Sequence, residues 1–147
     1  MKEREVLFIG CIFLGRLCLS VTFLFQGFYA IWFWDCIKTD VLGSVALWEF
    51  YGGKFTFLDT CIYAFYAYES FLVGTSIFLQ IFGGLLLGVG FFVRLGAICL
   101  LLQLAISTCI DYPFWFFEGS FMHQAFMNFL RNVAIFGGLL LSLSRKP

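Results

Sequence analysis

The stretch FLVGTSIFLQIFGGLLLGV at residues 71–89 decides how the rest of the chain is interpreted, because its 19 residues carry no charge. A helix of about 20 apolar residues crosses the hydrocarbon core of a bilayer. Three further stretches have the same character. The four predicted spans cover approximately residues 6–34, 71–89, 95–110 and 125–143. We therefore predict an all-α polytopic membrane protein, a bundle of four transmembrane helices forming one domain over residues 1–147.

The composition indicates that lipid is the solvent of most of the chain. Apolar residue types make up 62% of the sequence and charged types 12%, against roughly 45–50% and 25% in soluble domains. A soluble protein of this length has no interior large enough for so much apolar surface. The formal net charge is zero and no basic run occurs. These features exclude nucleic acid as an expected partner and favour the lipid bilayer.

The first apolar run, Val6 to Trp34, has 29 residues, whereas a secretory signal peptide has an apolar region of roughly 7–15 residues. The run ends in Trp32, Phe33 and Trp34, which is typical of an interfacial anchor and not of a cleavage site. We therefore expect a retained span. Only Gly90–Arg94 separates the second and third spans, so we expect these two to form a tight helical hairpin.

Loop charges predict the orientation of the bundle. With four spans, both ends of the chain lie on one side of the membrane. The cations on that side are Lys2, Arg4, Arg94, Arg145 and Lys146. The other side carries only Lys38 and Lys54 as clear loop cations, and all four tryptophans fall there. The positive-inside rule therefore predicts that both termini are cytoplasmic, and we expect the protein in a bacterial inner membrane.

The connection between the first two spans, residues 35–70, is long for a loop and contains the apolar stretch Tyr63–Tyr68. A solvated loop would not carry so many aromatic residues. One interpretation places this segment on the membrane surface or over the mouth of the bundle. In the other, Asp59 caps a helix that runs straight into the second span. The sequence leaves both open.

Two arginines fall inside predicted spans, where a charge costs about 2.5–3.5 kcal/mol on insertion scales unless it has a partner or a function. Arg16 either lies near mid-depth and contacts an anionic or quinone-like headgroup, or belongs to a helix that starts nearer Leu14 and extends its side chain to the cytoplasmic surface. Arg131 either contacts a ligand or extends outward to pair with Glu69 or Asp111. Both choices stay open.

Each span offers one polar or small face, which we expect to turn inward and away from lipid. The candidate ligand-binding residues on these faces are Arg16, Gln80, Gln103, Arg131 and Asn132. The candidate helix-packing residues are Gly83, Gly84, Gly88, Gly137 and Gly138. A GxxxG element such as Gly84–Gly88 lets helices approach closely, within one chain or in a homo-oligomer. The simpler interpretation of the polar faces is an interhelical network that only holds the bundle together.

The six cysteines and the single histidine give no metal or thiol-redox signature. No CxxC pair occurs, so the usual motif of a disulfide oxidoreductase is absent. Cys36 and Cys61 both fall in the predicted outer loop, where an oxidising compartment allows a disulfide. His123 stands alone, with no ligand spacing for zinc or haem. No catalytic motif is recognisable, which leaves the question of enzymatic activity open.

Several short motifs follow one another along the chain. The first span contains Gly15-Arg16-Leu17, followed by Phe23-Leu-Phe and Gly27. The second contains Gly83-Gly84-Leu-Leu-Leu-Gly88, followed by Arg94-Leu-Gly-Ala97. Pro113-Phe-Trp115 precedes the fourth span, which contains Arg131-Asn132 and then Gly137-Gly138-Leu-Leu. In order, this set resembles the pattern of the DoxX family of small four-helix membrane proteins, and it covers nearly the whole chain.

The resemblance implies a membrane redox context. DoxX-like proteins take their name from a thiosulfate:quinone oxidoreductase associated with a terminal oxidase, and some serve complexes that handle thiol and oxidative stress. Our hypothesis is an accessory subunit that binds a quinone or a membrane or soluble oxidoreductase. The alternative is a non-enzymatic scaffold or cargo factor that acts through residues 35–70. The chain departs from the family at Gln80, where Glu is frequent, and at Asp111-Tyr112, where His is frequent.

Overall fold

The computed structural model describes residues 2–52, 56–90 and 92–143, and helices account for nearly all of them. The elements are α1 (Lys2–Trp32), α2 (Trp34–Gly52), α3 (Thr56–Ala67), α4 (Glu69–Val89), α5 (Val93–Asp111), the 3-10 turn η1 (Phe114–Phe116) and α6 (Gly119–Leu143). The predicted all-α fold is confirmed for this part of the chain.

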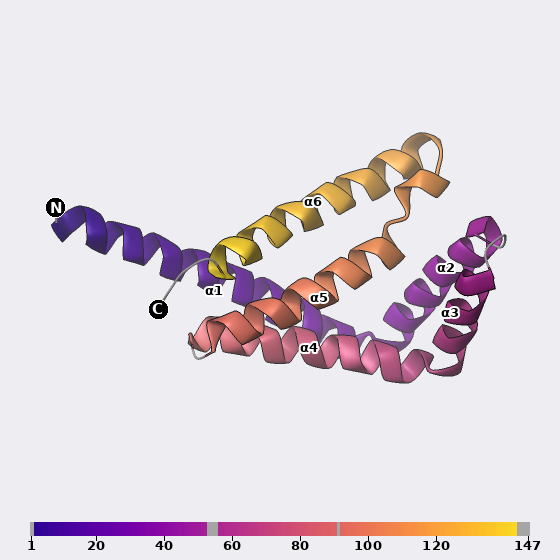
Figure 1. Ribbon diagram of the computed structural model, residues 1–147, viewed down its shortest axis with the longest axis horizontal. Coiled ribbons are helices and arrows are strands. Elements are labelled where there is room, and N and C mark those ends of the chain that lie inside the picture. The colour runs from indigo at the N-terminus through magenta and orange to yellow at the C-terminus, as the bar shows by residue number, and fades with distance from the viewer. Residues whose placement is uncertain (1, 53–55, 91, 144–147) are drawn as a thin grey trace.

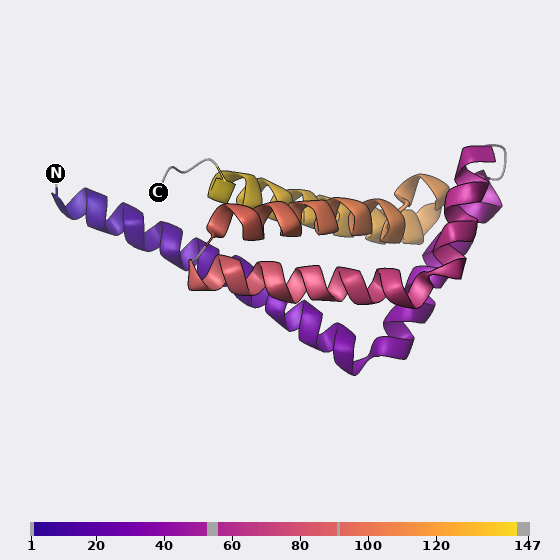
Figure 2. The ribbon, with the colours of Figure 1, turned by 60° about the horizontal axis from the view of Figure 1, so that its bottom comes forward.

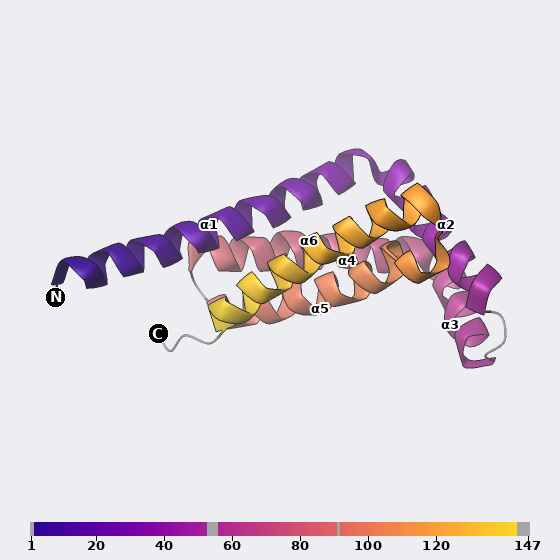
Figure 3. The same cartoon turned by 90° about the horizontal axis from the view of Figure 1, so that it is seen from above.

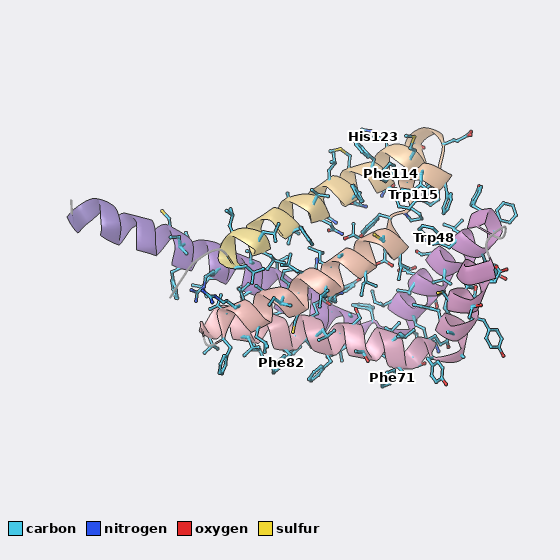
Figure 4. The ribbon with its side chains drawn as sticks, viewed as in Figure 1. Trp48, Phe71, Phe82, Phe114, Trp115 and His123 are labelled. Atoms are coloured by element: carbon cyan, nitrogen blue, oxygen red, sulfur yellow. The ribbon has the colours of Figure 1, made fainter. Side chains whose placement is uncertain are left out.

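Four of the helical segments are long and apolar enough to cross a membrane, as predicted. They are Gly10–Trp32, Glu69–Val89, Val93–Phe116 and Gly119–Leu143. Figure 1 shows these helices side by side, with α1 extending past the others at the end where the chain begins and ends. In a membrane the bulky apolar side chains on the outside of the bundle would face lipid, as Phe71 and Phe82 do along α4 (Figure 4).

Close helix packing defines the half of the bundle nearer the termini, which we call the inner half. Gly83 of α4 lies against Gly96 of α5, where a Cβ added to Gly96 would stand 2.9 Å from the Gly83 carbonyl oxygen. On the other side of α4, the Ser20 hydroxyl of α1 donates a buried hydrogen bond of 2.7 Å to the Gly84 carbonyl oxygen. Backbones can approach this closely only where side chains are small.

The largest hydrophobic cluster lies in the same inner half. Its fully buried members are Phe23 of α1, Leu87 of α4, Ala97 and Leu100 of α5, and Leu139 of α6. The glycine contacts and this cluster therefore hold the four spans together at one end. A smaller cluster of Ala30, Val73 and Ile77, with Trp34 packed against it, joins α1, α2 and α4 nearer the other end.

The α4–α5 connection is as tight as predicted. α4 ends at Val89, and Gly90 follows with φ of +81°, a left-handed conformation that glycine adopts without strain. Phe92 before α5 also has positive φ, at 54°, which is uncommon for a bulky residue. Gly90 and Phe92 therefore lie outside both helices, in the turn between the two spans.

The predicted outer loop is a helical hairpin made of α2 and α3, and it lies at the end of the bundle away from the termini (Figures 1 and 2). α2 contacts α5 and α4, and its Trp48 ring packs edge-on against Trp115 and Phe116 in the α5–α6 connection. The hairpin therefore covers the mouth of the bundle. Asp59 lies in the first turn of α3, which ends at Ala67 and does not run straight into α4.

An ion pair fixes the base of this hairpin. Lys38 of α2 pairs with Glu69, the first residue of α4, and both side chains are partly exposed. Farther along the hairpin, the Tyr66 hydroxyl donates a hydrogen bond of 3.2 Å to the Glu49 carboxylate. These contacts are polar and lie near the surface, in contrast to the apolar packing of the inner half.

The glycine predictions are mostly matched by the packing. Gly83, Gly84 and Gly88 of α4 and Gly138 of α6 all lie within 4 Å of a neighbouring helix at the position of a Cβ. Gly137 does not, because it faces away from the bundle into open space. Four contacts were not predicted: Gly96 against α4, Gly27 of α1 against the Ile81 side chain, Gly74 of α4 against Trp34, and Gly90 against Arg16.

The disulfide that the sequence allows between Cys36 and Cys61 is not formed, since both cysteines are free and exposed. Cys36 lies in the first turn of α2, whereas Cys61 follows the tip of the hairpin, near the start of α3. The 19 residues of α2 make its ends about 28 Å apart at 1.5 Å per residue. A disulfide needs Cα atoms roughly 4.4–6.8 Å apart, so an antiparallel hairpin keeps these two cysteines out of reach.

Candidate functional site

A cavity of about 410 Å³ occupies the half of the bundle nearer the α2–α3 hairpin, which we call the outer half. Its walls come from the last turns of α1 and α5, the first turns of α4, the start of α2, the middle of α6 and Phe65 of α3. The polar side chains that line it are Gln26, Tyr29, Thr75, Ser76, Gln80, Gln103, Ser107, Asp111, Tyr112, Arg131 and Asn132. The rest of the lining is apolar, and the volume suits a small organic molecule.

The cavity exists because the helices diverge toward the outer half. α1 and α6 touch in the inner half, where Leu19 lies against Gly138. From there the two helices separate, as Figures 1 and 2 show. Gln26 of α1 and Arg131 of α6 line the cavity and are exposed, so this edge of the cavity is open.

Side-chain amides form three hydrogen bonds between helices at or beside the cavity. Gln103 of α5 donates to the Ser76 hydroxyl of α4 at 2.9 Å. Gln80 of α4 donates to the Gln26 carbonyl of α1 at 2.9 Å. Asn132 of α6 donates to Thr108 of α5 at 3.0 Å. The predicted interhelical polar network is therefore present. It lies at the outer-half cavity, whereas the inner half has a packed core.

One end of the Gln103 amide is left without a partner. Gln103 is only 8% exposed, and its buried Oε1 has no hydrogen-bond partner among the described residues. Exchanging the amide oxygen and nitrogen would leave the nitrogen unpaired in its place, because Ser76 can serve only one of them. An unmade hydrogen bond of a buried polar group costs about 1–3 kcal/mol. Because Gln103 lines the cavity, a hydrogen-bonding ligand that reaches this end of the amide would remove that cost.

Two ionisable side chains also line the cavity, Asp111 at the end of α5 and Arg131 in α6. Arg131 is exposed and makes no ion pair within the part of the chain that is described. Glu69, one of its two expected partners, pairs with Lys38. Arg131 is therefore placed where it can contact a bound molecule, and the predicted pair with Glu69 is not formed.

Arg16 is the predicted ligand residue that the structure leaves out of the cavity. It lies in the inner half, where its Nη2 is close enough to Gly90 that an added Cβ would stand 2.7 Å away. Gly90 ends α4, so Arg16 is level with the α4–α5 turn and not at mid-depth. A cation beside a helix C-terminus is electrostatically favourable. Arg16 therefore lies beside the C-terminus of α4, on a helix that begins at Lys2 and not near Leu14.

Gln80, Gln103, Arg131 and Asn132 are thus brought together by the fold, and they come from three different helices. Sequence analysis gave no ligand role to Gln26 or Ser76, which complete the amide network. The i, i+4 spacing of Ser76 and Gln80 was a usable indication, because it puts both side chains on one face of α4.

Within the described residues, no group of three or more His, Cys, Asp or Glu side chains is placed to hold a metal ion. His123 is exposed at the outer end of α6, above the aromatic cluster of Phe114 and Trp115 (Figure 4). The site can offer hydrogen bonds, one basic and one acidic side chain, and apolar contact.

Comparison with known protein families, curated proteins and solved structures finds no match for this chain. The resemblance of its motifs to the DoxX family therefore remains a hypothesis, and the site has to be interpreted from its own geometry.

Proposed function

We propose that this protein is an accessory subunit of a membrane redox system that binds a quinone-like molecule in the outer-half cavity. The observation that carries the proposal is Gln103, whose buried amide has one unpaired end and whose side chain lines a cavity of about 410 Å³. The other polar lining groups are amides, hydroxyls, one arginine and one aspartate, and the rest of the lining is apolar. Native binding sites for small molecules combine such an apolar lining with a few polar groups.

A quinone-like headgroup matches this chemistry in both of its redox states. The carbonyl oxygens of a quinone accept hydrogen bonds, and the hydroxyls of the reduced form donate them. A glutamine amide can do either, since it carries one acceptor and two donors. Gln103 and Gln80 can therefore hold the ring before and after a two-electron reduction carried out by a partner. The departure from the DoxX pattern at Gln80 removes a carboxylate but keeps a hydrogen-bonding group.

The redox context rests on the resemblance stated above, and an accessory role rests on the residues of the site. The described lining offers a bound molecule amides, hydroxyls, one guanidinium and the Asp111 carboxylate. Such a set binds and orients but does not supply electrons. The electron donor would be a partner oxidoreductase.

Native mass spectrometry of the detergent-purified protein tests the binding proposal. We expect a retained small molecule of quinone mass, greatly reduced in Gln103→Leu. Gln124→Leu is the matched control, because Gln124 is exposed on α6 and does not line the cavity. Arg131→Ala should also weaken retention, whereas Arg16→Ala should not. Equal retention in Gln103→Leu and Gln124→Leu, or no ligand in the unmodified protein, would refute the proposal.

We also propose that both ends of the chain face the cytoplasm. The start of α1 and the end of α6 lie at the same end of the bundle (Figure 3), and the cations near the termini and Arg94 outnumber those of the α2–α3 side. A phosphatase that is active only outside the cytoplasm, fused after Pro147, should be inactive in a bacterial host. An active fusion would reverse the orientation.

A partner-binding scaffold is the second candidate, and the α2–α3 hairpin favours it. Phe50 near the end of α2 and Tyr63 of α3 are 80% and 78% exposed, although aromatic rings at this level also suit the headgroup layer. A complex seen by native electrophoresis of membranes that disappears in Phe50→Ser with Tyr63→Ser, while ligand retention is unchanged, would support a scaffold role.

A further inference from the structure

The cavity meets the surface of the bundle along two edges whose chemistry differs. Between α1 and α6 the exposed lining residues are Gln26, Tyr29 and Arg131, all of them polar. Between α4 and α5 the exposed lining residues include Leu72 and Ile106, which are 38% and 61% exposed. One edge is thus suited to polar groups and the other to hydrocarbon.

The α4–α5 edge is an apolar slot. Leu72 and Leu79 lie seven residues apart on one face of α4, and Ile106 and Ile110 lie four apart on one face of α5. Two hydroxyls on these helices are already bonded within their own helix: Thr75 donates to the Phe71 carbonyl at 2.8 Å and Ser107 to the Leu104 carbonyl at 3.3 Å. The slot therefore offers little hydrogen bonding to anything that passes through it.

The slot is bounded toward the inner half by direct helix contact. Gly83 and Gly96 bring α4 and α5 together there, and the Gln103–Ser76 hydrogen bond crosses between the same two helices. Figure 1 shows α4 and α5 diverging from their connection toward the α2–α3 end. Gln103 lies where that bond joins the two helices, and aliphatic cavity-lining residues follow on both helices toward the hairpin.

We propose that the bound molecule is a lipid-soluble compound with an apolar tail, and that the tail leaves the cavity between α4 and α5 into the bilayer. This inference rests on the proposed function, in which the polar head lies on Gln103. A tail in the slot contacts Leu72, Leu79, Ile106 and Ile110, so its methylenes stay out of water along the whole path. The same tail on the α1–α6 edge would desolvate Gln26, Tyr29 and Arg131 without a hydrogen bond in return.

The slot also defines the route of binding. A molecule dissolved in the bilayer can pass between α4 and α5 without crossing the membrane surface, because the slot faces the hydrocarbon that surrounds both spans. The ligand class is therefore a ring with carbonyl or hydroxyl groups and one flexible aliphatic or isoprenoid tail. Molecules without a tail would bind through the headgroup alone and more weakly.

The experiment uses two probes, a benzoquinone without a tail and the same ring with a decyl tail. Their apparent Kd values are measured with the full chain in nanodiscs at a fixed lipid-to-protein ratio, so that partitioning into lipid is the same for every variant. Leu72→Trp and Ile106→Trp each narrow the slot. Leu102→Trp is the control, since Leu102 is an exposed leucine of α5 that does not line the cavity.

We expect each slot variant to raise the Kd of the tailed probe about tenfold, as the loss of two or three methylene contacts would. The tail-less probe should bind both slot variants unchanged, which also shows that they are folded. Leu102→Trp should change neither value. An unchanged Kd of the tailed probe in both slot variants would overturn the inference while leaving the binding site intact.

Gln103→Leu separates the two proposals, because it should weaken both probes alike. If Gln103→Leu weakens both probes and the slot variants weaken neither, the site is correct and the tail route is wrong. If Gln103→Leu has no effect on either probe, or if neither probe binds the unmodified protein, the proposed function fails and the tail route fails with it.

Discussion

The inner and outer halves of this bundle use the same four helices in opposite ways. In the inner half, glycines let α4 and α5 come into backbone contact, and the buried Ser20 of α1 bonds directly to the α4 backbone. In the outer half the helices diverge around a cavity lined by Gln103, whose buried amide keeps one end unpaired. The Arg16 Nε of the inner half is buried and unpaired as well, but Arg16 does not line the cavity. The two halves therefore differ in whether their polar residues line a space that another molecule can fill.

The difference shows that a row of polar residues along one face of a membrane helix can serve either helix packing or ligand binding. Ser20 and Gln103 are both buried polar residues at helix interfaces. Ser20 meets a backbone carbonyl because Gly84 and Gly88 allow close approach, whereas Gln103 meets a single hydroxyl across a wider gap. The small residues on the facing helix therefore decide whether a polar group is structural or available. Four substitutions test this contrast.

The largest effect is expected from Gly96→Ala, which attacks the inner half. Its Cβ would stand 2.9 Å from the Gly83 carbonyl oxygen and 3.2 Å from the Leu87 backbone nitrogen, so backbone has to move. Overpacking of this kind costs about 1–3 kcal/mol. Gly137→Ala is the control, because nothing lies within 4 Å of that position. Thermal unfolding in the same detergent should show a lower Tm for Gly96→Ala alone, and equal Tm values would contradict the glycine contact.

The fold could be predicted from the sequence only in part. The 19 uncharged residues 71–89 located the second span to within two residues of α4, Glu69–Val89, because length and hydropathy suffice for that. The α2–α3 hairpin was not resolved into two helices, since aromatic residues on several faces hide a helical period. Hydropathy places a residue in a helix but does not give its level relative to other helices.

Arg16 shows the error that arises when the level of a residue relative to the other helices is not known. The sequence pattern groups Arg16 with Gln80, Gln103, Arg131 and Asn132. In the structure the other four line the cavity and Arg16 does not. The level of α1 against α4 is set by contacts such as Ser20 with Gly84 and Gly88. Arg16 comes one turn before Ser20, which puts it beside Gly90 in the inner half. No pattern within α1 alone encodes that register.

The next effect in size is expected from Ser20→Ala, which removes the buried bond from α1 to the Gly84 carbonyl. Interhelical hydrogen bonds in membrane proteins contribute about 0.6 kcal/mol on average and up to about 1.7. Thr22→Ala is the matched control, since the Thr22 hydroxyl bonds only to Cys18 of its own helix. The difference in unfolding free energy between the two variants measures the contact. A larger loss in Thr22→Ala would show that the inner half is not held in this way.

A smaller effect is expected from Lys38→Gln, which breaks the ion pair with Glu69 at the base of the hairpin. Both side chains are partly exposed, and exposed pairs contribute about 0.2–1 kcal/mol. A double-mutant cycle with Glu69→Gln isolates the coupling, which should shrink as salt is added because the pair is near the surface. Coupling that exceeds the effect of Ser20→Ala would mean that the outer half is held as firmly as the inner half.

The smallest effect on stability is expected from Gln103→Leu, although this residue is the centre of the proposed site. The substitution loses the bond to Ser76 but also removes the buried amide end that has no partner. Because these changes oppose each other, the unfolding free energy without ligand should stay within about 0.6 kcal/mol of the unmodified protein. Ligand binding should nevertheless fall about tenfold, the equivalent of about 1.4 kcal/mol. A loss of stability larger than that of Gly96→Ala, with binding unchanged, would make Gln103 a structural residue and erase the contrast between the two halves.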